Sequence, residues 1–137
     1  MKFIFDASSI VNLIKRGLTS MFMDGATTSL ALYESLNAVW KECRLLGRID
    51  ESTALSYVDI LSDVFIAIDR LTINGVEEEI FKIALKEGLT IYDASYIYLA
   101  SDNNLTLVTD DKKLEKKASK LVKVVSSSEL AKAYVHG

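Results

Sequence analysis

Acidic side chains stand at the ends of two short apolar segments of the sequence. Asp6 follows the apolar residues 3–5, and the pair Asp110 and Asp111 comes shortly after residues 105–108, which are apolar except for Thr106. Short, largely apolar segments of this kind are typical of buried strands. The carboxyl ends of parallel strands lie at the same edge of a sheet, where ligands bind. We therefore expect these carboxylates to face a common cleft.

Two further carboxylates extend this candidate cluster. Asp93 opens a predicted helix that is apolar almost all round, and Glu34 lies early in a long predicted helix. Carboxylates a few ångströms apart raise one another's pKa and oppose folding, and a divalent cation removes that penalty. Oxygen ligands suit Mg²⁺ or Mn²⁺, which can activate water and stabilise charge on a phosphate. The pattern indicates metal-dependent hydrolysis of phosphodiesters.

The composition points toward carboxylate chemistry as well. One cysteine, Cys43, and one histidine, His136, leave no residues for a disulfide framework, a cysteine-rich zinc site or a Ser-His-Asp triad. The 16 Lys and Arg against 19 Asp and Glu give a net charge of −3, which argues against holding nucleic acid mainly by bulk positive charge. Half of the 137 residues are hydrophobic, which suits a single domain over residues 1–137 with a sizeable core.

The elements that must position these residues alternate along the chain. Strands are expected at residues 3–5, 21–23, 65–68, 105–108 and 122–125. Helices are expected from Ser8 to Gly17, from caps at 27–29 to Gly47, from caps at 50–53 to about Asp63, over 77–87 before Gly88, over 91–103, over 112–121, and onward from a capping box of Ser126 and Glu129. Strands that alternate with helices predict an α/β fold with a mostly parallel sheet.

The long helix is expected to be amphipathic. Its predicted apolar face consists of Tyr33, Leu36, Val39, Trp40 and Cys43. A neighbouring polar stripe consists of Glu34, Asn37, Lys41 and Arg44. This spacing predicts that the apolar residues pack on the sheet and that the polar stripe lies beside them.

Each acid also has an ordinary structural interpretation. Asp is among the best helix N-caps, and Asp6, Asp93 and Asp111 each stand before or at the start of a predicted helix. Glu34 taken alone is typical of a solvated helix residue. The interpretation as a joint site is favoured because the serines at 8 and 9 could cap the first helix without a charge. A carboxylate at the start of the apolar helix would also need a partner.

Four segments around these acids resemble the motifs of the PIN domain, a family of metal-dependent nucleases that includes many prokaryotic toxins. The segments are Phe5-Asp6-Ala7-Ser8, Tyr33-Glu34-Ser35-Leu36-Asn37, Tyr92-Asp93-Ala94-Ser95-Tyr96 and Leu107-Val108-Thr109-Asp110-Asp111. They follow the family's order and span nearly the whole chain. The resemblance implies a three-layer α/β fold in which helices flank a mostly parallel central sheet.

The resemblance also implies roles for individual residues. The residues expected to hold Mg²⁺ or Mn²⁺ and to carry catalysis are the four acids Asp6, Glu34, Asp93 and Asp111. Ser8 and Thr109 would support the site by hydrogen bonds. Asp110 fills the variable position of the Thr-x-Asp motif, where it could weaken RNA contact or add to metal binding.

The size and order of the elements most resemble VapC-type toxins of type II toxin–antitoxin modules. This likeness implies a metal-dependent endoribonuclease that acts on RNA, is held inactive by a small antitoxin protein and often forms a homodimer. Two alternatives stay open, namely a housekeeping RNA-processing nuclease and a PIN-like scaffold that binds RNA or protein without cutting. A haloacid-dehalogenase phosphatase and a response-regulator receiver fit poorly, because both need acidic residues at other positions.

A run of lysines could supply the positive charge that the whole chain lacks. Six lysines lie between residues 112 and 123, and all but Lys123 are on a predicted helix whose Leu114, Ala118 and Leu121 are expected to face the core. The candidate RNA-binding residues are Lys112, Lys113, Lys116 and Lys117. A solvated helix surface is the ordinary alternative for such a run.

The sequence offers no membrane segment. It becomes charged too early for a signal peptide, and its longest apolar run, residues 64–68, is far shorter than the roughly 18 residues that a membrane span needs. We expect a cytoplasmic protein.

Overall fold

The centre of the protein is a sheet of five parallel strands. The computed structural model describes the backbone of residues 1–136 and the side chains of residues 1–134. The strands run in the spatial order β3-β2-β1-β4-β5, and every neighbouring pair is parallel. They are β1 (Phe3–Phe5), β2 (Gly25–Thr28), β3 (Asp69–Leu71), β4 (Thr106–Val108) and β5 (Val124–Val125). The expectation of a mostly parallel sheet is confirmed.

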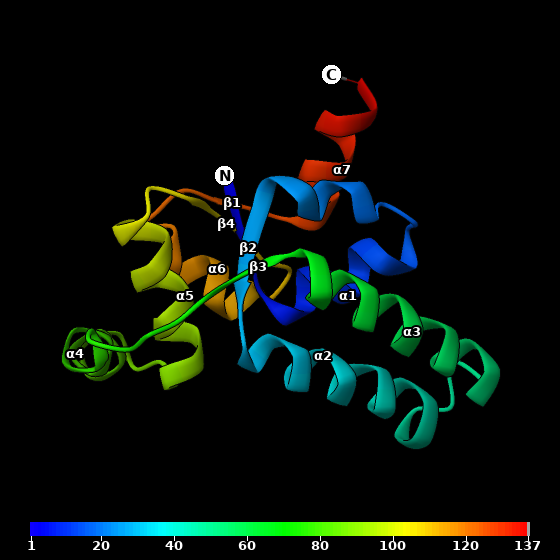
Figure 1. The fold of residues 1–137 in the computed structure, drawn as a ribbon. Coiled ribbons are helices and arrows are strands. Elements are labelled where there is room, and N and C mark those ends of the chain that lie inside the picture. The colour runs from blue at the N-terminus through cyan, green and yellow to red at the C-terminus, as the bar shows by residue number, and fades with distance from the viewer. Residues whose placement is uncertain (137) are drawn as a thin grey trace.

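Helices cover both faces of this sheet, as parallel strands require. Figure 1 shows α1 (Ala7–Lys15), α2 (Leu30–Trp40) and α3 (Glu51–Ala67) on one side, and α4 (Glu77–Glu87), α5 (Ile91–Asp102) and α6 (Lys112–Ala118) on the other. The terminal helix α7 (Ser127–His136) contacts α1. A short 3₁₀ segment, η1 (Thr19–Asp24), precedes β2, and a π-helical turn, η2 (Lys41–Leu45), extends α2. This is the predicted three-layer α/β architecture.

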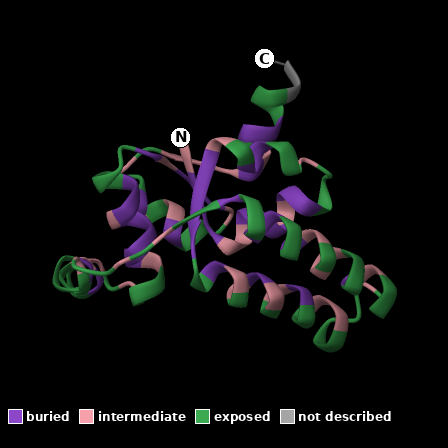
Figure 2. Cartoon of the chain, in the orientation of Figure 1, coloured by how far each residue is buried: buried purple, intermediate pink, exposed green. Residues whose placement is uncertain are grey.

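The two central strands form the most deeply buried part of the core. Ile4 and Phe5 of β1 and Leu107 and Val108 of β4 have no exposed surface. Figure 2 shows buried residues on β2 and on the inward helix faces, whereas the edge strand β3 is largely exposed. The ring of Phe5 meets that of Phe22 edge-on at 5.0 Å. These two largely apolar segments of the sequence are therefore central strands, as predicted.

The second strand lies after the segment expected to form it. Residues 21–23 belong to η1, and the strand β2 begins at Gly25. A side chain at Gly25 would collide with Phe5, since a Cβ there would lie 2.4 Å from its Cε2 atom. Thr27 also donates its hydroxyl to the Phe5 carbonyl at 2.7 Å. This strand pairs with β1 and β3 although its residues are small or polar, so the sequence showed no apolar pattern there.

The edge strand expected at residues 65–68 is wrong in position. The helix α3 continues to Ala67, because Leu61, Val64 and Phe65 share one buried face while Ile66 is 82% exposed. The strand β3 follows only at Asp69.

Two predicted helix faces and one set of predicted helix caps need correction. Tyr33 and Trp40 are exposed, and the buried face of α2 is formed by the smaller residues Ala31, Ser35 and Val39. Leu121 is exposed, because α6 ends at Ala118 before the next turn could carry it inward. The expected caps at residues 27 and 28 lie in β2, and Ser29 precedes α2 without a side-chain capping bond.

Two helix boundaries are confirmed. Gly88 ends α4 in the left-handed conformation, with φ of 66°. Ser126 and Glu129 form the reciprocal capping box, in which the Ser126 N–H donates to Glu129 at 3.3 Å and the Glu129 N–H donates to the Ser126 hydroxyl at 3.0 Å. Among the described residues, no helix is both long enough and apolar enough to cross a membrane.

Candidate active site

The carboxyl ends of β1 and β4 meet at one edge of the sheet. Phe5 is in register with Val108, and the Asp6 N–H donates to the Val108 carbonyl at 3.1 Å. Asp6 and the segment Thr109–Asp111 therefore leave the sheet side by side. This is the juxtaposition that the apolar segments predicted.

Asp6 is a buried carboxylate that is fully engaged by hydroxyl and amide donors. Its Oδ1 accepts hydrogen bonds from the Ser8 hydroxyl at 2.8 Å and from the Ser9 N–H at 2.9 Å. Its Oδ2 accepts the Thr109 hydroxyl. The Ser9 bond makes Asp6 the N-cap of α1, so the expectation that the following serines could cap this helix is wrong. The structural interpretation of Asp6 as a cap is therefore confirmed, and its role in metal binding stays a prediction.

Burial dominates the electrostatics of Asp6. Only 5% of the residue is exposed. Desolvation raises its pKa from 3.8 to about 6, against the hydrogen bonds from Thr109, Ser9 and Ser8, which favour the charged form. A carboxylate held at this cost to folding is typical of a functional site.

Asp93 lies in the first turn of α5 but does not cap it. The cap is Thr90, whose hydroxyl accepts the Asp93 N–H at 3.2 Å. The Asp93 carboxylate is half-buried, and its pKa is raised first by desolvation and then by the negative charge of Asp111, with Lys113 acting in the opposite direction. The capping interpretation of Asp93 is therefore wrong, because the hydrogen bond that caps α5 does not involve its carboxylate.

Glu34 is held toward the other acids by Tyr96. The Tyr96 hydroxyl donates to Glu34 Oε1 at 3.4 Å and accepts the Thr28 hydroxyl at 3.4 Å. Burial raises the pKa of Glu34, the bond from Tyr96 lowers it, and the charges of Asp93 and Asp6 raise it further. Carboxylates from three segments of the chain are therefore close enough for their charges to raise the pKa of Glu34.

Asp111 lies at the start of α6 and caps it. Its Oδ1 accepts the N–H groups of Lys113 at 2.9 Å and Leu114 at 3.1 Å, so it is the N-cap of this helix. Its own N–H donates to the Thr109 hydroxyl at 3.1 Å. The capping interpretation holds for Asp111, and its charge still acts on Asp93.

All four acids line a single cavity of about 310 Å³ at the edge of the sheet. Its lining residues are Asp6, Ala7, Ser8, Glu34, Asn37, Ala38, Lys41, Asp93, Tyr96 and Asp111. They come from four separate segments of the chain. We call this space the acid cavity.

The donor set of the acid cavity suits a hard divalent cation. All four acidic side chains offer oxygen atoms to a metal ion. Three of the four carboxyls have a raised pKa, so a cation would offset the cost of their burial and their mutual repulsion. Within the part of the chain that the structure describes, no three acidic, histidine or cysteine side chains form a ready-made metal site. Mg²⁺ keeps several of its waters in proteins, so the carboxylates that would hold it need not all contact the ion directly.

Two polar residues on the same helix face as Glu34 were not predicted as site residues. Asn37 and Lys41 line the acid cavity with Glu34. The three positions are three and four residues apart and share one face of the helix. Lys41 brings a positive charge to the acids, and the π-helical turn begins at this residue. The polar stripe of the long helix contains both residues, and their spacing from Glu34 is the signal that could have added them to the site.

The candidate RNA-binding lysines differ in their contacts. Lys112 pairs with Glu115 at 3.6 Å, and both Lys113 and Lys116 are exposed. Lys117 donates to the carbonyls of Glu87 at 2.8 Å and Gly88 at 3.1 Å, where it satisfies the carboxyl end of α4. RNA binding by these lysines stays a prediction, and Lys117 has a structural use for its ammonium group.

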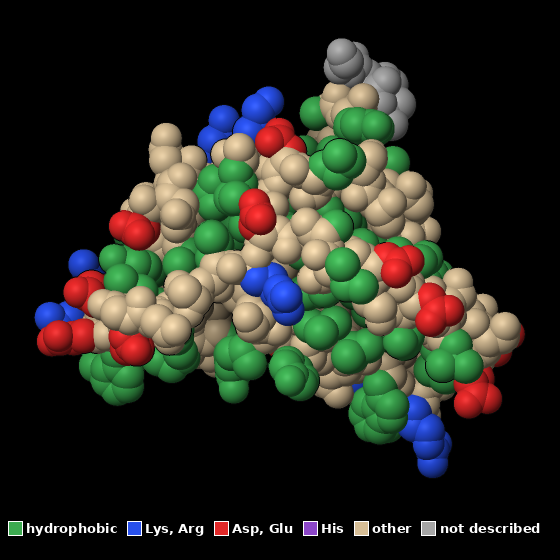
Figure 3. All heavy atoms as spheres, in the orientation of Figure 1, with side chains coloured by type: hydrophobic (Ala, Val, Ile, Leu, Met, Phe, Trp, Pro, Cys, Tyr) green, Lys and Arg blue, Asp and Glu red, His purple; other side chains and the backbone are tan. Residues whose placement is uncertain are grey.

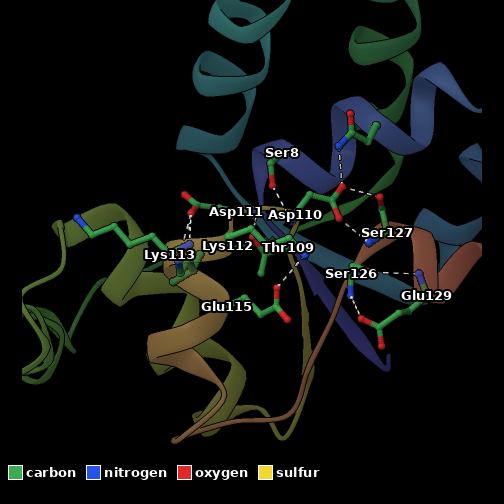
Figure 4. A network of polar contacts seen from close by, with 12 residues as sticks. Ser8, Thr109, Asp110, Asp111, Lys112, Lys113, Glu115, Ser126, Ser127 and Glu129 are labelled. Atoms are coloured by element: carbon green, nitrogen blue, oxygen red, sulfur yellow. Dashed lines mark hydrogen bonds and ion pairs between the residues drawn. The ribbon is translucent and has the colours of Figure 1, made fainter.

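Asp110 turns away from the acid cavity. Its carboxylate accepts the Asn12 amide at 2.7 Å, the Ser127 N–H at 2.8 Å and the Ser127 hydroxyl. Figure 4 shows Asp110 turned toward Ser127 of α7 while Asp111 points the other way, toward the start of α6. Burial raises the pKa of Asp110, but the bonds from Asn12 and Ser127 outweigh it and hold the pKa below its usual value.

Asp110 therefore ties α1, α7 and the Thr-x-Asp loop together. Its N–H donates to the Ser8 hydroxyl at 3.0 Å, and Ser8 in turn donates to Asp6. Of the two roles left open for Asp110, metal binding has no support from its position. A structural role accounts for its contacts.

Replacing Asp110 by Ala should lower the free energy of unfolding by about 2 kcal/mol, because the Asn12 and Ser127 donors lose their acceptor. Urea unfolding monitored by circular dichroism measures this. The exposed Asp102 is the matched control, and its replacement by Ala should have little effect. Equal stability of the two variants would contradict the role given to Asp110.

The fold and this acid cavity define a family. Residues 4–120 match the family model of the PIN domain, and the chain belongs to that family. Two curated relatives mark it as a PIN domain of the VapC type.

These relatives and one solved structure come from Pyrobaculum aerophilum. Ribonuclease VapC3 is 33% identical over 130 residues, which cover 89% of this chain and 98% of the relative. Exonuclease VapC9 is 38% identical over 89 residues, which cover 65% of this chain and 63% of the relative, so the match spans less than two thirds of that protein. The crystal structure of PAE2754 superposes with a TM-score of 0.80 at 31% identity, and covers 100% of this chain and 98% of that one.

Proposed function

We propose that this PIN domain is a metal-dependent endoribonuclease that acts as the toxin of a toxin–antitoxin pair. The observation that carries the proposal is the convergence of Asp6, Glu34, Asp93 and Asp111 on one cavity. The names of the relatives, ribonuclease and exonuclease, support nucleic acid as the substrate.

The four acids would hold Mg²⁺ or Mn²⁺ in the acid cavity. When bound, such an ion supplies activation of water and stabilisation of charge on the phosphate. The chain's own residues orient the carboxylates: Thr109 and Ser8 fix Asp6, and Tyr96 fixes Glu34. Lys41 offers a cation to a phosphate that enters the cavity.

A circular RNA tests the reaction, since only an endonuclease can open it. With Mg²⁺ or Mn²⁺ the protein should linearise the circle, and with EDTA it should not. An Asp93→Asn sample purified in parallel controls for contaminating nucleases. A circle that stays intact while a linear RNA is degraded from one end would replace the endonuclease by an exonuclease. No cleavage of either RNA would favour the non-catalytic scaffold.

Exposed apolar side chains support a protein partner. Figure 3 shows apolar groups projecting along the lower edge of the molecule. Phe81 and Leu85 of α4, and Tyr33 and Trp40 of α2, are all more than half exposed. Exposed apolar patches are typical of interaction sites. A small antitoxin or a second copy of the chain would cover such a surface.

Toxicity tests the proposed biological role. Expression of the wild-type chain should arrest growth of a bacterial host, whereas Asp93→Asn expressed at the same level should not. Growth that is equally slow with both chains would mean that nuclease activity is not the cause.

A further inference from the structure

A second pocket adjoins the acid cavity and has a different chemistry. It has a volume of about 130 Å³ and lies between the carboxyl ends of β2 and β3 and the start of α5. Glu34 and Tyr96 line both spaces, so these side chains form a wall that the two spaces share. A molecule in the smaller pocket would lie next to a phosphate in the acid cavity.

The walls of this pocket are mainly apolar. Leu30, Leu71, Ile73, Ile91 and Tyr92 line it, and Tyr92 is 50% exposed. Among the described residues that line it, Glu34 alone carries a charge, and Tyr96 already donates to that carboxylate. A phosphate would be repelled here, whereas a flat, uncharged ring would bury apolar surface.

Hydroxyl groups surround the apolar walls. Ser29 and Thr72 line the pocket and are exposed. The Thr72 oxygen accepts the Asn74 N–H at 3.2 Å, which leaves its own hydrogen free to donate. Hydroxyls both donate and accept, so they can pair with the edge of more than one nucleobase.

We propose that this pocket receives one unpaired base of the RNA strand, next to the phosphate that is cleaved, with Tyr92 as the residue that contacts the base. This inference rests on the proposed function, because it assumes that RNA enters the acid cavity. Proteins that recognise single-stranded RNA stack unpaired bases on aromatic side chains. The shared wall of Glu34 and Tyr96 links the base to the reaction, and an apolar side chain of a protein partner is the competing occupant.

Abasic substitution tests the pocket directly. A linear single-stranded RNA with one defined cleavage site is prepared with a single abasic nucleotide at each position around that site. For the wild-type protein, an abasic nucleotide at one of these positions should raise KM by about tenfold, which is the loss of affinity expected when one stacked base is removed. In Tyr92→Ala the normal RNA should already show this KM, with kcat unchanged, and the abasic RNA should lose no more than about twofold further.

Matched variants separate the pocket from general damage to the fold. Tyr92→Phe keeps the ring and should restore the wild-type KM. Phe81→Ala removes an aromatic ring of similar exposure, 55%, that does not line the pocket, and its KM should be that of the wild type. Equal cleavage of all abasic RNAs by the wild-type protein, or equal KM values for Tyr92→Ala and Phe81→Ala, would overturn the base pocket and favour a protein side chain as its occupant.

A binding assay keeps this test separate from the proposed nuclease activity. RNA with 2-aminopurine at the sensitive position, or at each position in turn if no cleavage occurs, is mixed with protein in EDTA. Quenching by the wild type and by Phe81→Ala, but not by Tyr92→Ala, would support the pocket even if the RNA is never cut. Cleavage without any Tyr92-dependent quenching would contradict the pocket and leave the nuclease intact.

Discussion

Asp93→Asn is expected to lower the rate of RNA cleavage by about a thousandfold, because removing one metal-binding charge removes about 4 kcal/mol of transition-state stabilisation. The free energy of unfolding should not fall. Thr90 caps α5, so no structural hydrogen bond of the cap depends on the Asp93 carboxylate. Removing a charge that is half-buried and repelled by Asp111 also relieves the folded state. Single-turnover cleavage and urea unfolding of the same sample measure both effects.

Asp102→Asn is the matched control for this variant. It removes the same charge from the same helix, at the exposed end away from the acid cavity. Its cleavage rate should equal that of the wild type. A thousandfold loss in Asp102→Asn as well, or full activity of Asp93→Asn, would refute the role of Asp93.

Asp6→Asn is expected to abolish cleavage and at the same time to stabilise the metal-free protein near pH 8. Burial raises the pKa of Asp6 from 3.8 to about 6. Each pKa unit corresponds to about 1.4 kcal/mol, so the charged carboxylate opposes folding by at most about 3 kcal/mol above pH 6. Asn keeps the oxygen that accepts the Ser8 and Ser9 hydrogen bonds and carries no charge. Its amide nitrogen would face the Thr109 hydroxyl, which can accept a hydrogen bond as well as donate one.

The pH dependence of this effect has a definite sign. Between pH 3.8 and about 6, the folded protein binds a proton at Asp6 that the unfolded chain has released. The wild-type protein therefore loses the Asp6 contribution to stability as pH rises through this window, and keeps it below the window. Asp6→Asn lacks this loss, so the two proteins should differ most above pH 6 and least below pH 4.

Urea unfolding in EDTA at a series of pH values measures the difference between the two proteins. Asp50→Asn is an informative control, because Asp50 caps α3 at the surface and its pKa is lowered by the Thr53 N–H. This substitution should not stabilise the protein at pH 8. An Asp6→Asn protein that is less stable than the wild type at every pH would show that the burial of Asp6 carries no such penalty.

Much of the candidate site could be predicted because its residues follow local rules. Asp6 and Asp111 come after short apolar strands, and the parallel register of Phe5 with Val108 brings their segments together. The glycine that ends α4 and the capping box of α7 are also local signals, and the structure contains both. Features set by neighbouring residues in the sequence were therefore accessible without coordinates.

Features that depend on distant contacts were not accessible in the same way. The strand β2 begins with a glycine because its backbone approaches the Phe5 ring closely at Gly25. Asp110 binds Asn12 and Ser127, which lie 98 and 17 residues away, so its role could not be chosen from its own neighbourhood. Lys41 shares a helix face with Glu34, but only the packing of α2 shows that this face borders the acid cavity.

The central claim is that carboxylates from four distant segments hold one or more divalent cations. Isothermal titration of the metal-free protein with Mn²⁺ tests it most directly, with wild type, Asp6→Asn, Asp93→Asn and Asp102→Asn compared in one buffer. We expect the wild type and Asp102→Asn to bind Mn²⁺ alike and both cavity variants to bind at least about a hundredfold more weakly, since even outer partners of a metal site change affinity by 10- to 100-fold. Equal Mn²⁺ affinity in all four proteins, or no binding by the wild type, would contradict the account.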